Sequence, residues 1–198
     1  KRRALVIGGI GASEDTSEIV DLGSFTSVPG PELGELERNG AAAVPLDEDG
    51  KIITIGGYNY GELASTVIFD PKTNKFTKGP TMRTGRNCPA AVKIDESRIL
   101  VIGGLSDGLD FLATTEILDI KSMEFSEGPT MATRRYEAAA VKLADEERVL
   151  VTDLSGPGTR RGGKGKSDSM SRALRHMVNR GLSRGWTAWL ERWQAVRS

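Results

Sequence analysis

The chain has 198 residues, of which 38% are hydrophobic and 27% charged, so it is long enough to bury one sizeable core. Its single cysteine, Cys88, excludes an intrachain disulfide and fits a reducing compartment. No apolar run approaches the ~18 residues that a membrane-spanning helix needs. We therefore expect an intracellular, cytoplasmic protein. Because the chain begins at Lys1 rather than Met, we expect the N-terminus of its parent to lie outside it.

The formal net charge of zero hides an unequal distribution of charge along the chain. Residues 155–198 carry ten Lys or Arg against two acidic residues, and the part before them carries 17 against 25. The tail is therefore basic and the body acidic. Such asymmetry indicates a tail with a partner of its own, or a tail that lies against its own body.

Three landmarks recur at a spacing of just under 50 residues: an Ile-Gly-Gly triplet, an Asp that ends a β-branched run, and a Gly-Pro pair. They stand at Ile7-Gly8-Gly9, Ile55-Gly56-Gly57 and Ile102-Gly103-Gly104, at Asp21, Asp70 and Asp119, and at Gly30-Pro31, Gly79-Pro80 and Gly128-Pro129. Several landmarks in constant order indicate a repeat architecture.

Each copy contains short apolar or β-branched runs separated by Gly, Pro, Asn or Asp, which predicts antiparallel β-strands. In chain order we expect strands at 4–7, 18–21 and around Phe25, then at 41–44, 51–55, 66–69 and 75–77, then at 90–92, 99–102, 116–118 and around Phe125, and last at 138–141 and 149–152. Asp153 and Leu154 replace the glycine pair of the fourth copy. Four short strands per repeat are typical of one β-propeller blade.

The repeat resembles the kelch repeat. The likeness lies in a small-residue first strand, a hydrophobic run that ends in Gly-Gly, an Asp after the third strand, and the sequence Gly-Pro-Thr-Met at 79–82 and 128–131. Phe25, Phe76 and Phe125 would stand where kelch repeats usually carry Trp, and we expect Phe76 and Phe125 to belong to the core. The resemblance implies an all-β fold of kelch-like blades, with a partial blade at 1–31, blades at 40–80 and 88–129, and a partial blade at 137–154.

Two whole and two partial blades are fewer than the roughly four to eight that close a propeller ring. We therefore expect a partial propeller or open arc over residues 1–154, with exposed strand edges on its end blades.

In such blades the loops before the first strand and the loops between the second and third strands share one rim, and the kelch resemblance implies that a protein or peptide partner binds there. Arg38, Arg86 and Arg135 recur just before a first strand. Their guanidinium groups would suit a carboxylate or phosphate on the partner, or else have a structural role in capping the rim or pairing with acids of a neighbouring blade. The candidate partner-binding residues are Arg38, Tyr58, Asn59, Tyr60, Arg86, Asn87, Arg135 and Tyr136.

Catalytic chemistry finds little support in the sequence. His176 is the only histidine, so neither a His cluster nor a Ser-His-Asp arrangement can be assembled. Asp107 and Asp110 fit a solvated loop better than a calcium site, and residues 158–164 match only the opening of a phosphate-binding loop. We expect no metal, no cofactor and a non-enzymatic interaction module that serves as scaffold or adaptor. The alternative is a fragment of a larger kelch-containing enzyme whose catalytic residues lie outside this chain.

The basic tail divides into two parts. Residues 155–168 are rich in Gly, Arg and Lys and predict a flexible linker. Residues 169–198 show apolar positions at helical spacing with Arg on the other surface, which predicts a basic amphipathic α-helix bearing Trp186, Trp189 and Trp193. Three fates stay open for this helix: packing on the propeller, binding of a calmodulin- or centrin-like protein, or contact with an anionic membrane. Nucleic acid is the less favoured partner.

Overall fold

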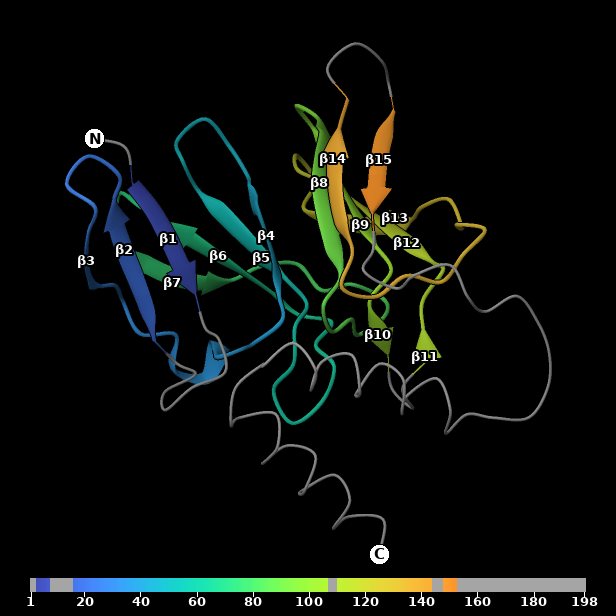
Figure 1. Ribbon diagram of the computed structural model, residues 1–198, viewed down its shortest axis with the longest axis horizontal. Coiled ribbons are helices and arrows are strands. Elements are labelled where there is room, and N and C mark those ends of the chain that lie inside the picture. The colour runs from blue at the N-terminus through green and yellow to red at the C-terminus, as the bar shows by residue number, and fades with distance from the viewer. Residues whose placement is uncertain (1–2, 8–15, 107–109, 144–147, 153–198) are drawn as a thin grey trace, which may run out of the picture. The chain divides into compact units, whose positions relative to one another are not determined.

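The computed structural model describes residues 3–7, 16–106, 110–143 and 148–152, and all of these belong to one compact unit. This part of the chain folds into antiparallel β-sheets with one 3-10 turn, η1 (Gly34–Leu36), and without an α-helix (Figure 1). It contains no helix that is long and apolar enough to cross a membrane. The all-β prediction is confirmed. The predicted linker and amphipathic helix lie outside the described residues.

Two sheets have four strands each, and in both the strands lie side by side in chain order, apart from a small hairpin inserted in the second. Blade 2, as we call the first, contains β4 (Ala42–Pro45), β5 (Ile52–Ile55), β6 (Thr66–Asp70) and β7 (Lys75–Lys78). Blade 3 contains β8 (Ala90–Asp95), β9 (Arg98–Ile102), β12 (Thr115–Asp119) and β13 (Glu124–Glu127). The segment of chain that connects β9 to β12 contains a separate hairpin of β10 (Leu105–Ser106) and β11 (Asp110–Phe111). The two complete copies of the repeat are therefore two antiparallel four-stranded blades.

The first and last sheets are smaller. Blade 1 contains β1 (Arg3–Ile7), β2 (Ser17–Asp21) and β3 (Thr26–Pro29), and blade 4 contains β14 (Ala139–Lys142) and β15 (Val149–Thr152). Within each of these sheets β1 and β15 are edge strands. The three-stranded and two-stranded sheets agree with the partial copies expected at either end of the repeats.

The expected place of Phe25, on the last strand of blade 1, is wrong. Phe25 lies in the turn before β3 with a φ of 55°, a conformation that Asn74 and Met123 share at the same point of blades 2 and 3. The residue of blade 1 that matches Phe76 and Phe125 is Ser27, since Ser27 pairs with Val20 as Phe76 pairs with Phe69. Sequence spacing alone favours this alignment, because Phe25, Asn74 and Met123 are 49 residues apart. Phe25 was assigned to the position that Ser27 occupies, two residues later, because Phe25 is the nearest aromatic residue.

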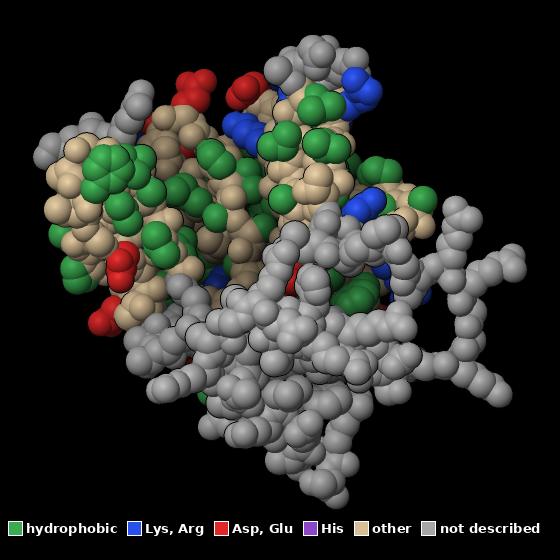
Figure 2. Space-filling model, in the orientation of Figure 1, with side chains coloured by type: hydrophobic (Ala, Val, Ile, Leu, Met, Phe, Trp, Pro, Cys, Tyr) green, Lys and Arg blue, Asp and Glu red, His purple; other side chains and the backbone are tan. Residues whose placement is uncertain are grey.

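Exposed apolar side chains gather on the terminal blades. Six of the seven large hydrophobic side chains exposed in the described part of the chain belong there: Val6, Leu22, Phe25, Val28, Val141 and Leu150. Figure 2 shows this apolar surface over the β1–β3 sheet. A hollow of about 220 Å³, lined by Leu5 and Ile7 of β1 and by β4 and β5, separates blade 1 from blade 2. The terminal blades thus bury less apolar surface than the central pair.

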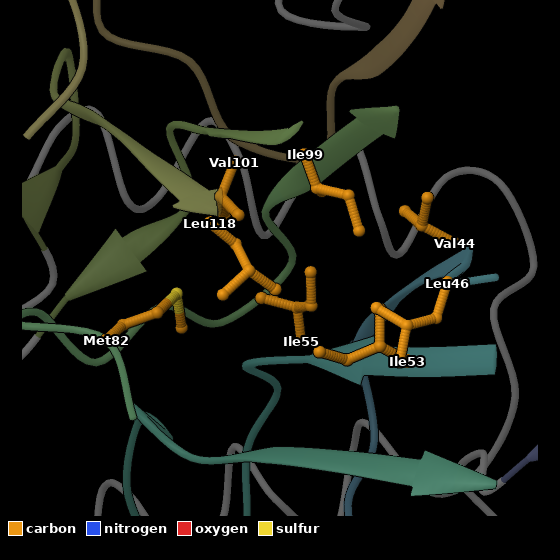
Figure 3. Close-up of a cluster of buried hydrophobic side chains, with 8 residues drawn as sticks. All are labelled: Val44, Leu46, Ile53, Ile55, Met82, Ile99, Val101 and Leu118. Atoms are coloured by element: carbon orange, nitrogen blue, oxygen red, sulfur yellow. The ribbon is translucent and has the colours of Figure 1, made fainter. Parts of the chain in front are cut away.

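The main core lies between blades 2 and 3 (Figure 3). Alternate residues of β5 and of β9 point into it, as expected for half-buried strands. Its members are Val44, Leu46, Ile53, Ile55, Met82, Ile99, Val101 and Leu118. Full burial of such a side chain stabilises the fold by about 1.5–3 kcal/mol, so this interface holds the two central blades together. Phe76 and Phe125 are only half-buried at its border: Phe76 packs on Phe69 with ring centroids 5.2 Å apart, and Phe125 packs against the cluster.

The paired glycines join successive blades. Gly56 and Gly57 have φ values of 69° and 103°, which glycine adopts without strain. A side chain on Gly56 would collide with the Arg86 carbonyl oxygen, and the Gly57 N–H donates to that same oxygen at 2.8 Å. Gly104 and Arg135 repeat this bond between blade 3 and the segment before β14. The glycines of both complete blades thus permit a close approach between successive blades.

The Gly-Pro pairs are explained by a hydroxyl group that the repeat also carries. The Thr66 hydroxyl donates to the Pro80 carbonyl at 2.7 Å while the Gly79 N–H donates to the Thr66 carbonyl at 3.0 Å. A side chain on Gly79 would collide with Thr66 Oγ1. Ser17 with Pro31 and Thr115 with Pro129 repeat the arrangement. In blades 1, 2 and 3 the segment after the outer strand is thus fastened to the start of the strand beside it.

Candidate functional site

The rim expected from strand order is present in the structure. We call "the rim" the loops at residues 30–41, 79–89 and 128–138, which precede β4, β8 and β14, together with residues 56–65, 103–106 and 110–114, which lie between the second and third strands of blades 2 and 3. Bridges between the two kinds of loop join Asn39 to Tyr58, Asn87 to Leu105, and Arg135 to Leu112. Loops far apart in the sequence therefore form one continuous edge of the described blades.

Arg38 lies inside blade 2, with 3% of its surface exposed. Its Nη1 donates to the carbonyl oxygens of Gly56 at 3.1 Å and Ser65 at 3.0 Å, and its Nε donates to the Leu36 carbonyl. Desolvation lowers the pKa of this guanidinium to about 10, which still leaves it charged near neutral pH. The side chain thus spans the β5–β6 loop of its own blade and donates to carbonyl groups at both ends of that loop.

Arg86 occupies the same place in blade 3 and has an additional partner. Its guanidinium donates to the carbonyls of Gly103 at 2.8 Å and Thr114 at 3.0 Å, and to Glu116 Oε1 at 3.1 and 3.2 Å. Burial lowers the pKa of Arg86 and the adjacent Glu116 carboxylate raises it. The Glu116 carboxylate also accepts the backbone N–H groups of Arg83 and Thr84. This network fastens the start of blade 3 to its third strand.

These contacts favour the structural role for two of the three recurring arginines. Arg38 and Arg86 are buried, and their donors are used within their own blades. The carboxylate that Arg86 meets belongs to its own blade and not, as the structural alternative assumed, to a neighbouring one. Arg135 is half-buried, and its N–H bonds to the Leu112 carbonyl at 3.0 Å.

Tyr136 joins blade 4 to blade 3. Its ring stacks on Phe111 of β11, with centroids 5.3 Å apart and an interplanar angle of 12°. Its hydroxyl is in hydrogen-bonding contact with Cys88 and Glu137, and burial raises its pKa. Burial also raises the pKa of the Cys88 thiol to about 11, so this cysteine stays protonated and weakly nucleophilic at neutral pH. Tyr136 therefore serves as a half-buried link between blades.

Tyr58, Asn59 and Tyr60 form the tip of the β5–β6 loop. The Asn59 N–H donates to the Gly61 carbonyl at 3.0 Å, and its Nδ2 donates to Glu37 Oε1 at 3.3 Å. Asn59 Oδ1 is buried without a hydrogen-bond partner. Tyr60 is 87% exposed and has a φ of 52°. Asn87, in contrast, is buried beside Cys88, whose thiol donates to its side-chain oxygen at 3.3 Å.

Sequence reasoning missed three residues of the rim, Glu37, Glu62 and Phe111, and also Glu116 of β12, which binds Arg86. No recurring landmark marks Glu116, because the matching residue of blade 2 is Val67. The hydroxyl groups of Ser17, Thr66 and Thr115 could have been found, since they recur at steps of 49 residues. Trp186, Trp189 and Trp193 lie outside the described residues. Within those residues no group of three or more His, Cys, Asp or Glu is placed to hold a metal ion.

Known proteins with kelch repeats are similar in sequence to the part of the chain that forms these blades. Residues 49–83, which run from the β4–β5 turn to the loop before β8, match the Kelch motif. An F-box/kelch-repeat protein of Arabidopsis thaliana is 35% identical over 80 residues, which make up 40% of this chain and 18% of that protein. The aligned part is thus less than a fifth of the relative. Residues 49–83 thus carry a kelch motif, and the spacing of the landmarks and the four-stranded blades agree with that similarity.

Proposed function

We propose that this chain is a non-enzymatic protein-interaction module, a scaffold or adaptor, whose protein or peptide partner binds at the rim. Kelch repeats generally mediate protein–protein interaction, and the F-box/kelch-repeat relative fits that class. The rim brings together loops of successive blades, which gives a partner a surface built from several repeats. Arg38, Arg86 and Asn87 are buried, which narrows the proposed contact set to Tyr58, Asn59, Tyr60, Arg135 and Tyr136.

The exposed ring of Tyr60 is the observation that carries this proposal. An aromatic side chain with 87% exposure gains little in the free chain, and its left-handed φ of 52° costs conformational energy for a bulky residue. The loop is nonetheless well held, because the Leu63 N–H donates to the Gly57 carbonyl at 2.8 Å and Tyr58 bridges Asn39. A rigid loop that presents an aromatic ring is typical of an interface anchor.

A pair of matched variants tests the rim. Phe25 is also an exposed aromatic at positive φ, 82% exposed with φ 55°, but it lies in the β2–β3 turn away from the rim. We expect Tyr60→Ala to abolish binding of at least one protein that the wild-type chain captures, and Phe25→Ala to preserve it. Capture followed by titration of each purified partner against both variants measures the effect. Equal binding by the two variants would overturn the rim assignment.

A fragment of a larger kelch-containing enzyme is the alternative. It requires further blades in the parent chain, with His and Tyr in loops that face the channel. The sequence of the full parent distinguishes the two, because repeats without such residues would favour the interaction module.

For the tail we propose a separate contact, argued from sequence alone. The apolar face with three tryptophans and the arginine-rich opposite face of residues 169–198 suit the groove of a calmodulin- or centrin-like protein or an anionic membrane. The wild-type spectrum of these tryptophans distinguishes such contacts from packing on the blades, as argued below.

A further inference from the structure

Strand β1 is paired on one side only. In blades 2 and 3 the second strands, β5 and β9, each lie between a first and a third strand. β1 is the second strand of blade 1, because Ile7 precedes its glycine pair as Ile55 does in β5. Among the described residues β1 pairs with β2 alone. Its other side, which we call the open edge of β1, therefore presents backbone N–H and C=O groups that no neighbouring strand of the sheet satisfies.

An apolar hollow adjoins this edge. The hollow of about 220 Å³ between blades 1 and 2 is lined by Leu5 and Ile7 of β1 on one side and by residues of β4 and β5 on the other. Leu5 and Ile7 are only half-buried, although their counterparts in β5 have no exposed surface. The hollow is thus shared by β1 and by β4, the first strand of the next blade.

The interface between blades 2 and 3 shows what fills such a space. There Val44 of the first strand β4 lies opposite Ile53 and is 3% exposed. Ala91 of β8 packs against the core that contains Val44. Ala43 of β4 stands at the same register position as Ala91, yet it is exposed. An aliphatic residue opposite Leu5, on a strand paired with β1, would cover Ala43 in the same way.

The first strands of the repeat indicate what kind of segment fits this place. They read Ala42-Ala43-Val44, Ala90-Ala91-Val92 and Ala139-Ala140-Val141, and each runs antiparallel to its second strand. β8 lies beside both β4 and β14, so these first strands form a row. A strand on the open edge of β1 would extend this row past β4, with small residues next to its neighbour and a valine in the hollow.

We propose that the open edge of β1 is a docking site for an extended segment of a partner protein, which pairs antiparallel to β1 as the fourth strand of blade 1. The segment carries two small residues followed by an aliphatic residue, and the aliphatic side chain lies opposite Leu5 in the hollow. Backbone hydrogen bonds give strand addition its affinity, and the pocket for a side chain gives its specificity. This site goes beyond the proposed rim function and does not depend on it.

A peptide with the sequence of residues 39–47 carries the first strand of blade 2 and tests this pairing. Added to the full chain, it should slow hydrogen exchange at those amides of residues 4–7 that β2 leaves unpaired. The other edge strand, β15, should exchange at the same rate with and without the peptide. A control peptide with Val44→Asp should give no protection, because a carboxylate is not accommodated in an apolar hollow.

Variants of the chain test the role of the hollow. Ala43→Leu places an aliphatic side chain in the hollow from the side of β4. It should raise the peptide concentration that gives half-maximal protection of β1 by about tenfold, because the valine of the peptide loses its apolar site. Ala139→Leu adds the same side chain at an exposed position of another first strand and should leave that concentration unchanged.

The possible results separate this site from its alternatives. An equal loss in the two variants, equal protection of β15, or protection by the Val44→Asp peptide would overturn the proposal. Protection of β1 that rises with the concentration of the chain alone would identify a second copy as the occupant and would contradict a separate partner. Tyr60→Ala should leave the effect of the peptide unchanged, so the rim function and the docking site can fail independently.

Discussion

At the scale of single residues, the two buried arginines differ in one neighbour. Arg86 pairs with the Glu116 carboxylate, while Val67 stands at the matching place beside Arg38. Both guanidiniums donate to two loop carbonyls in the same way. Blade 2 therefore shows that the arginine fastens the loop without an ion pair, and that the carboxylate of blade 3 is an addition to this arrangement.

This difference predicts unequal costs for removing the two partners. Arg86→Ala leaves the Glu116 carboxylate buried without its counterion and should lower the free energy of unfolding by about 3–5 kcal/mol. Glu116→Val recreates the arrangement of blade 2 and should cost less, about 1–3 kcal/mol, for the two backbone N–H groups left without an acceptor. Urea unfolding of the full chain measures both. A Glu116→Val variant as unstable as Arg86→Ala would contradict this account.

At the scale of elements, each blade is closed by the hydroxyl of its third strand. The Gly-Pro pair ends the fourth strand, and the Ser or Thr hydroxyl binds the proline carbonyl at 2.6–2.7 Å in all three blades that have a third strand. The recurring glycine is thus explained by this contact, because the hydroxyl group fills the space that a side chain would need.

The glycine and the hydroxyl should therefore be coupled. Gly79→Ala should destabilise the chain by roughly 1–3 kcal/mol, because its side chain collides with Thr66 Oγ1. Addition of Thr66→Ala removes the collision, so the double variant should lose less than the sum of the two single losses. Gly61→Ala, where no atom lies within 4 Å of the added carbon, is the control and should change little. Strict additivity in thermal unfolding would refute the coupling.

The tail at residues 169–198 can be followed by its tryptophan fluorescence. All three tryptophans of the chain lie at 186, 189 and 193, so the tryptophan emission of the whole protein reports on the tail alone. We expect this emission to shift to the blue when calmodulin or anionic vesicles are added, and the shift to disappear in Trp186→Ala with Trp189→Ala. An emission that is already blue-shifted in the free chain and unchanged by either addition would mean that the tail packs on its own body.

At the scale of the whole molecule, the strands of the complete blades followed from short β-branched runs and from turn residues. Residues 66–69 and 75–77, for example, became β6 and β7 within one residue. Strand order predicted which residues lie in the rim loops, but it did not predict which of their side chains are exposed. The sequence pattern of an Arg before a first strand is the same for an exposed side chain and for one buried across a loop. Only tertiary packing decides which of the two directions the side chain takes. The β10–β11 hairpin and the place of Phe25 were missed for a local reason, since short loops lack a hydrophobic period.

Unequal burial along the repeats predicts unequal local stability. Ile53, Ile55, Ile99 and Val101 are fully buried between blades 2 and 3, whereas Val6 and Leu150 of the terminal sheets are about half exposed. Native-state hydrogen exchange should therefore be slowest at Ile52–Ile55 and at residues 99–102, and faster in β1 and β15. Uniform protection through Leu5 and Leu150 would instead indicate that the edge strands pair between copies of the chain.

The central claim, that the rim is the partner face, is tested most directly by photo-crosslinking in cells. A benzophenone amino acid replaces Tyr60 in one chain and Phe25 in another, which places the same probe at two exposed sites of similar backbone conformation. The account predicts a discrete crosslinked partner from position 60 and none from position 25. A partner crosslinked from position 25 alone would contradict it, because it would place the interface on the outer turn of blade 1.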